Sequence, residues 1–138
     1  MIKQIFVNLP VSDLDKSMEF FANLGMKFDK KFTDNTAACM IIGKNIYAML
    51  LTEKSFKGFI NKKESVNAHK NTEVINALQV SGRKEVDELM KKAFSAGAIP
   101  ANERYDLGWM YGHSFYDLDG HMWEVFHLDA KKRPKSKK

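Results

Sequence analysis

The two halves of the chain repeat one pattern of secondary structure, and this repeat limits the folds open to the sequence. In each half a strand-like segment with alternating apolar residues leads into a helix that ends before a glycine, Gly25 or Gly97. The predicted strand and helix cover residues 2–9 and 14–24 in the first half, and residues 74–81 and 85–96 in the second. Because three more strand-like segments follow each helix, we predict two similar strand-helix-strand-strand-strand modules.

Turn-forming residues separate the remaining strands. The pairs Asp34-Asn35 and Lys44-Asn45 mark two of these turns. The further predicted strands cover 26–33, 37–42 and 46–52 in the first half, and 99–105, 111–117 and 121–128 in the second. A polar, lysine-rich stretch between the halves carries apolar residues at the spacing of one short amphipathic helix. We therefore predict module one over 1–60, a connector over 61–72 and module two over 73–128.

The net charge of +5 comes from one end of the chain. Six of the 22 lysines and arginines lie in residues 131–138, and the rest of the chain is close to neutral. We therefore predict a basic flexible tail over 129–138 and no nucleic-acid partner. No apolar run is long enough to span a membrane, so we expect no membrane partner. Cys39 is the only cysteine, which rules out an internal disulfide and favours a cytoplasmic protein.

The end of module two carries a distinctive motif. Asp117-Leu118-Asp119-Gly120 predicts a tight hairpin turn, and Glu124 follows on the final strand. This pattern, together with the opening Val11-Ser12-Asp13-Leu14, resembles the vicinal oxygen chelate superfamily, which includes glyoxalase I, extradiol dioxygenases and bleomycin-resistance proteins. The resemblance covers residues 1–128 and implies one domain of α+β class. In it, tandem βαβββ modules would form an open, cup-shaped mixed β-barrel with the helices outside.

The resemblance also marks four positions where metal-binding relatives hold a divalent ion. In this chain the first two positions fall on Phe6 and Ile75. The third falls on the strand over 46–52, where no inward candidate is a carboxylate, and the fourth is Glu124. One carboxylate is a poor site for a hard divalent ion, because such ions need several oxygen or imidazole ligands. We therefore expect no metal cofactor, with a divalent metal as the alternative.

Strand alternation then gives the residues that would line the cup. The predicted ligand-binding residues are Phe6, Asn8, Tyr47, Met49, Leu51, Ile75, Gln79, Trp109, Tyr111, His113, Met122, Glu124 and Phe126. Large apolar residues on such a face often pack in the core, so the alternative for each of them is a packing role without ligand contact. For Trp109 and Tyr111 the alternatives are a flexible rim of the cup and a bulge packed on the neighbouring half. Glu124 differs, because a carboxylate among apolar walls is costly without a partner.

Two functional hypotheses follow from the resemblance. In the first, the chain binds a small, planar or partly aromatic ligand in an apolar cup without metal, as bleomycin-resistance proteins do. In the second it is a metal-dependent enzyme similar to lactoylglutathione lyase or to an extradiol dioxygenase, with Glu124 as the catalytic residue. In either case we expect a homodimer, because the sheet edges otherwise stay open.

Overall fold

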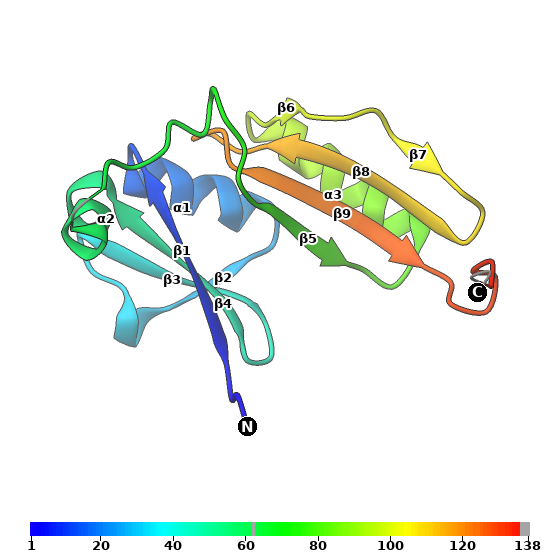
Figure 1. Ribbon diagram of the computed structural model, residues 1–138, viewed down its shortest axis with the longest axis horizontal. Coiled ribbons are helices and arrows are strands. Elements are labelled where there is room, and N and C mark those ends of the chain that lie inside the picture. The colour runs from blue at the N-terminus through cyan, green and yellow to red at the C-terminus, as the bar shows by residue number, and fades with distance from the viewer. Residues whose placement is uncertain (62, 136–138) are drawn as a thin grey trace. The chain divides into compact units, whose positions relative to one another are not determined.

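The computed structural model describes residues 1–61 and 63–135, which form two compact units, residues 1–71 and residues from Thr72 onward (Figure 1). The boundary falls inside the predicted connector. Residue 62 of the predicted connector and residues 136–138 of the predicted tail lie outside the described residues. No helix in the described residues is long and apolar enough to cross a membrane.

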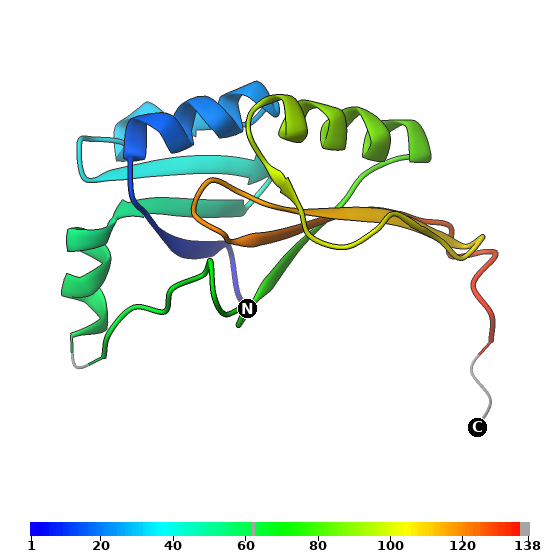
Figure 2. The same ribbon diagram turned by 90° about the horizontal axis from the view of Figure 1, so that it is seen from above.

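The first unit is a four-stranded mixed sheet with helices. Its elements are β1 (Ile5–Val11), α1 (Leu14–Asn23), β2 (Lys27–Asp29), the short 3-10 helix η1 (Lys30–Phe32), β3 (Ala37–Gly43), β4 (Ile46–Thr52) and α2 (Glu53–Ile60). The strand order is β1-β4-β3-β2, in which β1 runs parallel to β4 and the other neighbours are antiparallel. Figure 2 shows α1 on one side of this sheet and α2 on the other.

Local interactions set the limits of α1. The Asp13 side chain accepts a hydrogen bond of 3.1 Å from the backbone N–H of Lys16, which satisfies a free donor of the first turn. The helix ends before Gly25, whose φ of 98° belongs to the left-handed region that glycine adopts without strain. Phe20 and Phe21 are each 2% exposed and stack edge to face at 4.9 Å, so this helix supplies much of the unit's core.

The second unit repeats this topology. Its elements are β5 (Ile75–Gln79), α3 (Arg83–Ser95), β6 (Ile99–Pro100), β7 (Tyr105–Asp106), β8 (Met110–Tyr116) and β9 (Met122–Leu128). The sheet order is β5-β9-β8-β6, with β7 also paired to β8, and β5 runs parallel to β9. The predicted α+β class of two βαβββ modules with open mixed sheets is therefore confirmed.

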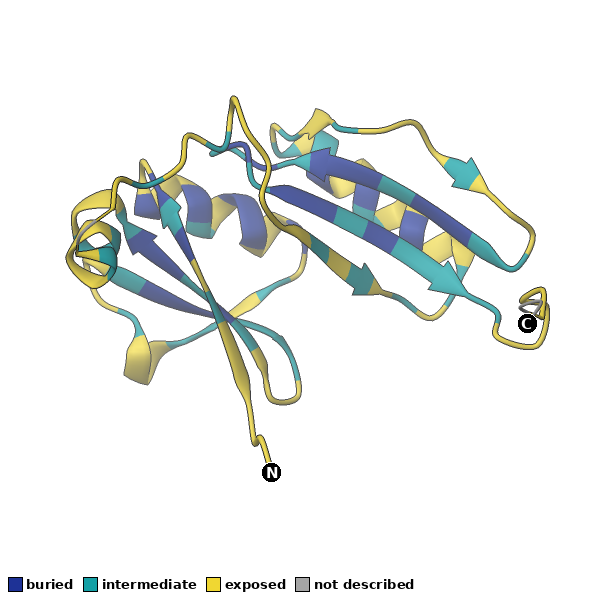
Figure 3. Ribbon diagram, in the orientation of Figure 1, coloured by how far each residue is buried: buried dark blue, intermediate teal, exposed yellow. Residues whose placement is uncertain are grey.

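The core of the second unit lies between α3 and its sheet. Val86 and Ala93 of α3 are fully buried, as are Phe115 of β8 and Val125 of β9, and Figure 3 shows the same alternation of buried and exposed positions along α3. Burying this apolar surface is the main contribution to the stability of the unit. It also fixes which face of β8 and β9 points away from the helix.

The Asp117 turn holds β9 in register with β8. The Oδ1 atom of Asp117 accepts the backbone N–H groups of Asp119 at 2.9 Å and His121 at 3.0 Å. Its Oδ2 atom accepts the indole N–H of buried Trp123 at 2.9 Å. Burial raises the pKa of this carboxyl, while the three hydrogen bonds oppose that rise. Gly120 completes the turn with a φ of 84°, as the motif predicts.

Two predicted strands are shorter in the structure than in the sequence-based prediction. The segment over 26–33 leaves the sheet at Asp29, because the Asp29 carboxylate accepts the N–H of Lys31 at 3.0 Å and starts the turn of η1. The segment over 99–105 divides into β6 and β7, since residues 101–104 oppose only His113 and Ser114 of β8. There the Ser114 hydroxyl accepts the N–H of Asn102 at 2.9 Å and so supports the bulge.

Candidate functional site

The sheet of the second unit has one face against α3 and one face turned away from it, here called the open face. Alternation on the central strand places Trp123 and Val125 against α3 and Glu124 on the open face. Strand pairing extends this face across the sheet, because Glu124 lies opposite Ala77 of β5 and Ser114 of β8. The predicted ligand-binding residues Ile75, Gln79, Met122, Glu124 and Phe126 all share the open face.

Tyr105 also belongs to the open face, although it is not among the ligand-binding residues predicted from the sequence. It pairs with Gly112 of β8, and its ring lies directly over that glycine. A Cβ built on Gly112 would lie 2.6 Å from the Cζ atom of Tyr105, so the ring occupies the space that any larger residue would need. A glycine between Tyr111 and His113 on a predicted strand was the available signal, since glycine in a strand often marks such a close approach.

The Tyr105 hydroxyl is buried beside the Glu124 carboxylate. Among the described residues the hydroxyl makes no hydrogen bond that meets the usual limits of distance and angle, and it is close enough to Glu124 for that charge to act on it. Burial, followed by the negative charge of Glu124 and a weak hydrogen bond with its carboxylate, raises the pKa of Tyr105 to about 12. The hydroxyl therefore stays protonated at neutral pH, and the site offers one O–H donor next to one carboxylate acceptor.

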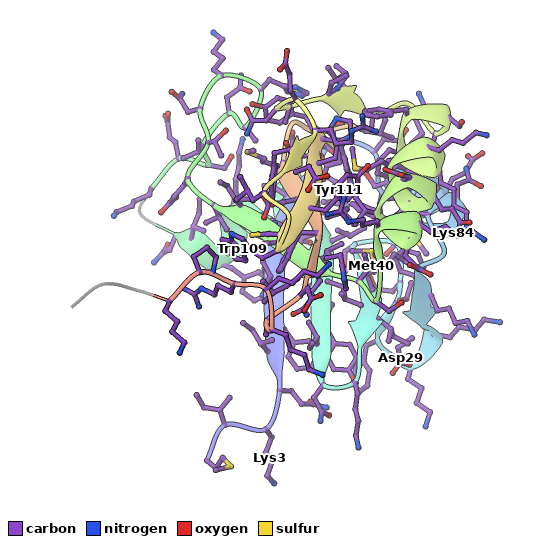
Figure 4. All side chains as sticks on the ribbon, turned by 90° about the vertical axis from the view of Figure 1, so that its right-hand side faces the viewer. Lys3, Asp29, Met40, Lys84, Trp109 and Tyr111 are labelled. Atoms are coloured by element: carbon purple, nitrogen blue, oxygen red, sulfur yellow. The ribbon has the colours of Figure 1, made fainter. Side chains whose placement is uncertain are left out.

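The structure does not bring Tyr111 and His113 to the open face. Both point toward α3, where the Tyr111 hydroxyl donates a hydrogen bond of 2.7 Å to Asp87. The His113 ring meets the Phe94 ring edge to face, with the centroids 5.6 Å apart. Figure 4 shows Tyr111 between β8 and α3. These two residues therefore belong to a different surface from Glu124.

Trp109 lies at the tip of the β7–β8 hairpin. The N–H of Leu107 donates to the carbonyl of Met110 at 2.8 Å, which closes the turn around Trp109. The carbonyl of Trp109 accepts the N–H of Asp129 at 2.7 Å, and the Arg133 guanidinium lies 5.6 Å from the centre of the indole ring. Trp109 thus contacts the described beginning of the basic tail (Figure 4).

The remaining predicted ligand-binding residues lie in the first unit and share one face of its sheet. Register places Phe6 beside Tyr47, Asn8 beside Met49 and Pro10 beside Leu51. The rings of Phe6 and Tyr47 stack with centroids 4.7 Å apart and an angle of 11° between their planes, and Phe6 is 45% exposed. This pair is a flat, accessible aromatic surface, whereas Leu51 is 3% exposed and serves packing.

The donor set of this chain does not fit a divalent metal at the positions that the resemblance marks. Phe6 and Ile75 have no ligating atom, and Tyr47, Met49 and Leu51 include no carboxylate or imidazole. In the part of the chain that the structure describes, no three His, Cys, Asp or Glu side chains gather as a metal-binding group. Glu124 alone is too few ligands for a hard divalent ion.

Comparison with known proteins identifies the family. Residues 3–43 match the family model of the bleomycin resistance protein-like N-terminal domain. A hypothetical protein from S. aureus is 31% identical, with 93% of this chain and 95% of that chain covered and a TM-score of 0.78. A glyoxalase/bleomycin resistance protein/dioxygenase family enzyme from Burkholderia phytofirmans is 13% identical, with 89% and 96% covered and a TM-score of 0.76. The chain belongs to the vicinal oxygen chelate superfamily.

A further similar structure is a mutant of the fosfomycin resistance protein FosX from Listeria monocytogenes, complexed with Mn(II) and a dihydroxypropylphosphonic acid. It is 22% identical, with 91% of this chain and 90% of that chain covered and a TM-score of 0.66. At this identity the likeness shows the superfamily fold alone. No curated protein matches the chain in sequence.

Proposed function

We propose that this superfamily member binds a small, planar or partly aromatic ligand without a metal, and that the open face carrying Tyr105 and Glu124 holds its polar group. The buried hydroxyl of Tyr105 beside the Glu124 carboxylate carries this proposal, because together they place one donor and one acceptor on the open face. A ligand that accepts from Tyr105 and donates to Glu124 would satisfy both groups at once.

The surroundings of the pair suit such a ligand. Phe126 flanks Glu124 on the same strand face and is half-buried, and Ile75 of β5 is 54% exposed, whereas Met122 on the other side of Glu124 is 8% exposed and largely buried. An accessible apolar wall gains roughly 25 cal/mol for each Å² of apolar surface that a ligand covers. The two polar groups then fix the orientation of the ligand, which is the usual division of roles in small-molecule sites. The stacked Phe6 and Tyr47 rings supply a second flat apolar surface for the same class of ligand.

A metal-dependent lyase or dioxygenase is the alternative function. The fosfomycin resistance protein among the similar structures is recorded with Mn(II), so the fold accommodates a metal in that relative. Here the marked positions lack the donors, and we therefore propose that no divalent metal is a cofactor. Glu124 beside Tyr105 could also move a proton to or from a bound ligand, and in that case Glu124 would be the catalytic base.

The proposal includes a homodimer in the cytoplasm. Exposed apolar residues lie on the edge strands β1 and β5, where Ile5 and Ile75 are each 54% exposed. Unpaired strand edges that carry apolar side chains favour association with another chain. A second copy of this chain would cover such edges symmetrically. Light scattering at micromolar concentration tests this part of the proposal, and a monomer would contradict it.

Ligand-detected NMR with a set of planar aromatic compounds tests the ligand site. We expect compounds that bind the wild type to lose affinity about tenfold or more in Tyr105→Phe and in Glu124→Gln, because each change removes one directed hydrogen bond. Glu88→Gln is the matched control, since Glu88 is exposed on α3 and lies on the other side of the sheet. Binding that neither Tyr105→Phe nor Glu124→Gln weakens would contradict the proposed site.

Stability separates a binding role of Glu124 from a structural one. Glu124→Gln keeps the shape of the side chain and removes a half-buried charge. We therefore expect the variant to be as stable as the wild type or more stable in urea unfolding. A variant that fails to fold would show that Glu124 is a structural carboxylate.

A further inference from the structure

The second unit has a groove on the α3 side of its sheet, separate from the open face. Its volume is about 600 Å³, and it is open to solvent. The lining residues are Asp87, Met90, Lys91, Phe94 and Ser95 of α3, Arg104 of the β6–β7 connection and His113 of β8. None of them belongs to the open face, so the groove is a different site from the one proposed above.

The floor of the groove is apolar and aromatic. Met90 is 2% exposed, and Phe94 is half-buried with its ring against His113 at 5.6 Å. The Phe94 and His113 rings come from the helix and the sheet respectively, so the rigid core of the unit holds them in place. A flat apolar group placed on this floor would remove Phe94 from water without any rearrangement of the backbone.

Two cations stand at the edge of this floor with no ion-pair partner among the described residues. Lys91 and Arg104 are both exposed, and neither lies within 4.0 Å of a described carboxylate oxygen. Arg83 on the same helix is different, because it donates two hydrogen bonds to Asp106 at 2.6 Å and 2.9 Å. Arg104 does contact Tyr111, with its guanidinium carbon 5.8 Å from the centre of that ring and a hydrogen bond to the hydroxyl, but no described carboxylate neutralises it. The charges of Lys91 and Arg104 are therefore available to an anionic ligand.

Asp87 is the one acidic residue of the lining, and it is already engaged. Its Oδ1 atom accepts the hydroxyl of Tyr111 at 2.7 Å, and this hydrogen bond is the largest cause of the raised pKa of Tyr111. With one carboxylate and two cations the groove keeps an excess of positive charge. The arrangement favours an anionic ligand over a cationic one.

His113 adds a polar group between the floor and the cations. Burial, followed by the charge of Arg104, lowers the pKa of His113, while the charge of Asp87 opposes this. At neutral pH the imidazole is therefore neutral and offers one N–H donor and one acceptor nitrogen. A neutral ring needs no second anion to balance it, so a single carboxylate suits the groove.

We propose that this groove binds a small carboxylate with a flat apolar body, such as an aryl carboxylate. Arg104 and Lys91 hold the carboxylate, and Arg104 can do so through two parallel N–H groups. The flat body rests on Phe94 and Met90, and His113 donates to a polar substituent or to the carboxylate itself. The inference is independent of the ligand proposed for the open face.

The test is a titration of the ¹⁵N-labelled full chain with sodium benzoate, at constant ionic strength, followed by NMR. We expect saturable shifts at His113, Phe94 and Arg104. Lys91→Gln and Arg104→Gln should each weaken binding about tenfold, which corresponds to about 1.4 kcal/mol. Lys92→Gln is the matched control, because Lys92 is an exposed neighbour on α3 that does not line the groove, and it should leave the affinity unchanged.

Two further probes separate the contribution of the flat apolar ring from that of the negative charge. Benzyl alcohol has the same ring without the carboxylate, and inorganic phosphate has charge without the ring. Weaker binding of both than of benzoate supports the site as described. Equal binding of benzyl alcohol, equal binding of phosphate, or an equal loss in Lys92→Gln would each overturn it. Shifts confined to Glu124 and Phe126 would place benzoate on the open face instead and would also overturn it.

Discussion

Replacement of Gly112 by alanine perturbs the contact that builds the open face. A Cβ at this position would lie 2.6 Å and 2.9 Å from the Cζ and Cε1 atoms of Tyr105, where carbon atoms in contact normally stay about 3.5 to 4.0 Å apart. The ring must therefore move by about 1 Å or leave its place. Overpacking of this kind costs about 1 to 3 kcal/mol, so we expect Gly112→Ala to lower the free energy of unfolding by that amount.

The sign of this effect should depend on Tyr105. The φ of Gly112 is not in the left-handed region, so alanine fits the backbone there. Glycine within a strand is less favourable than alanine by about 0.5 to 1 kcal/mol. In a Tyr105→Ala background, Gly112→Ala should accordingly stabilise the protein slightly. The double-mutant cycle should give a coupling energy of about 1.5 to 4 kcal/mol between these two positions.

Urea unfolding followed by tryptophan fluorescence measures all four proteins of the cycle. Both tryptophans, Trp109 and Trp123, lie in the second unit, so the signal reports on the unit that carries the contact. If Gly112→Ala changes stability equally in the two backgrounds, within about 0.5 kcal/mol, the ring does not occupy the space over Gly112 and the description of the site is wrong.

Three more predictions concern charge. The lowered pKa of His113 means that the folded protein binds a proton at this ring less readily than the unfolded chain does. The contribution of His113 to stability is therefore full above pH 6.5 and is lost as the pH falls through the lowered pKa. His113→Asn should flatten this pH dependence of the free energy of unfolding in urea, and an equal effect of the control His69→Asn would contradict it. The hydrogen bonds from Arg83 hold the pKa of Asp106 at about 2, so Arg83→Gln should move its NMR titration toward 3.8, and an unchanged midpoint would refute the pairing. Deletion of residues 131–138 should lower the free energy of unfolding by no more than about 1 kcal/mol, the value of an exposed cation–π contact, whereas a loss above about 2 kcal/mol would show that the tail packs on the second unit.

Features that depend on residues close together in sequence could be predicted from the sequence. The turn at Asp117 is local, because one carboxylate binds backbone groups two and four residues further on, and its motif predicts both the turn and the register of Glu124. The helix limits at Asp13 and Gly25 follow from local capping in the same way. For such features the chemistry of a short segment is sufficient.

Features that depend on pairing between strands were harder to predict. Unbroken pairing from Ile99 and Tyr116 would set Tyr105 opposite Met110, whereas the extra residues of the bulge in 101–104 set it opposite Gly112. That bulge needs the Ser114 hydroxyl, which lies twelve residues from the N–H that it accepts. The direction of Tyr111 and His113 could have been derived by counting across the hairpin from Glu124 to its partner Ser114. Their position next to Trp109 suggested a rim, whereas the strand register places them against α3.

Metal titration of the protein, purified without chelator, decides whether the chain binds its ligand without a divalent ion. Nickel, zinc, manganese and iron should bind no more tightly than to a generic surface histidine, because Glu124 is the single ligand at the positions that the superfamily uses. Calorimetry of the wild type and of Glu124→Ala should therefore give the same weak response. One equivalent of metal bound with affinity below about 1 μM, or about 8 kcal/mol, and lost in Glu124→Ala would contradict the account and favour a metal-dependent enzyme.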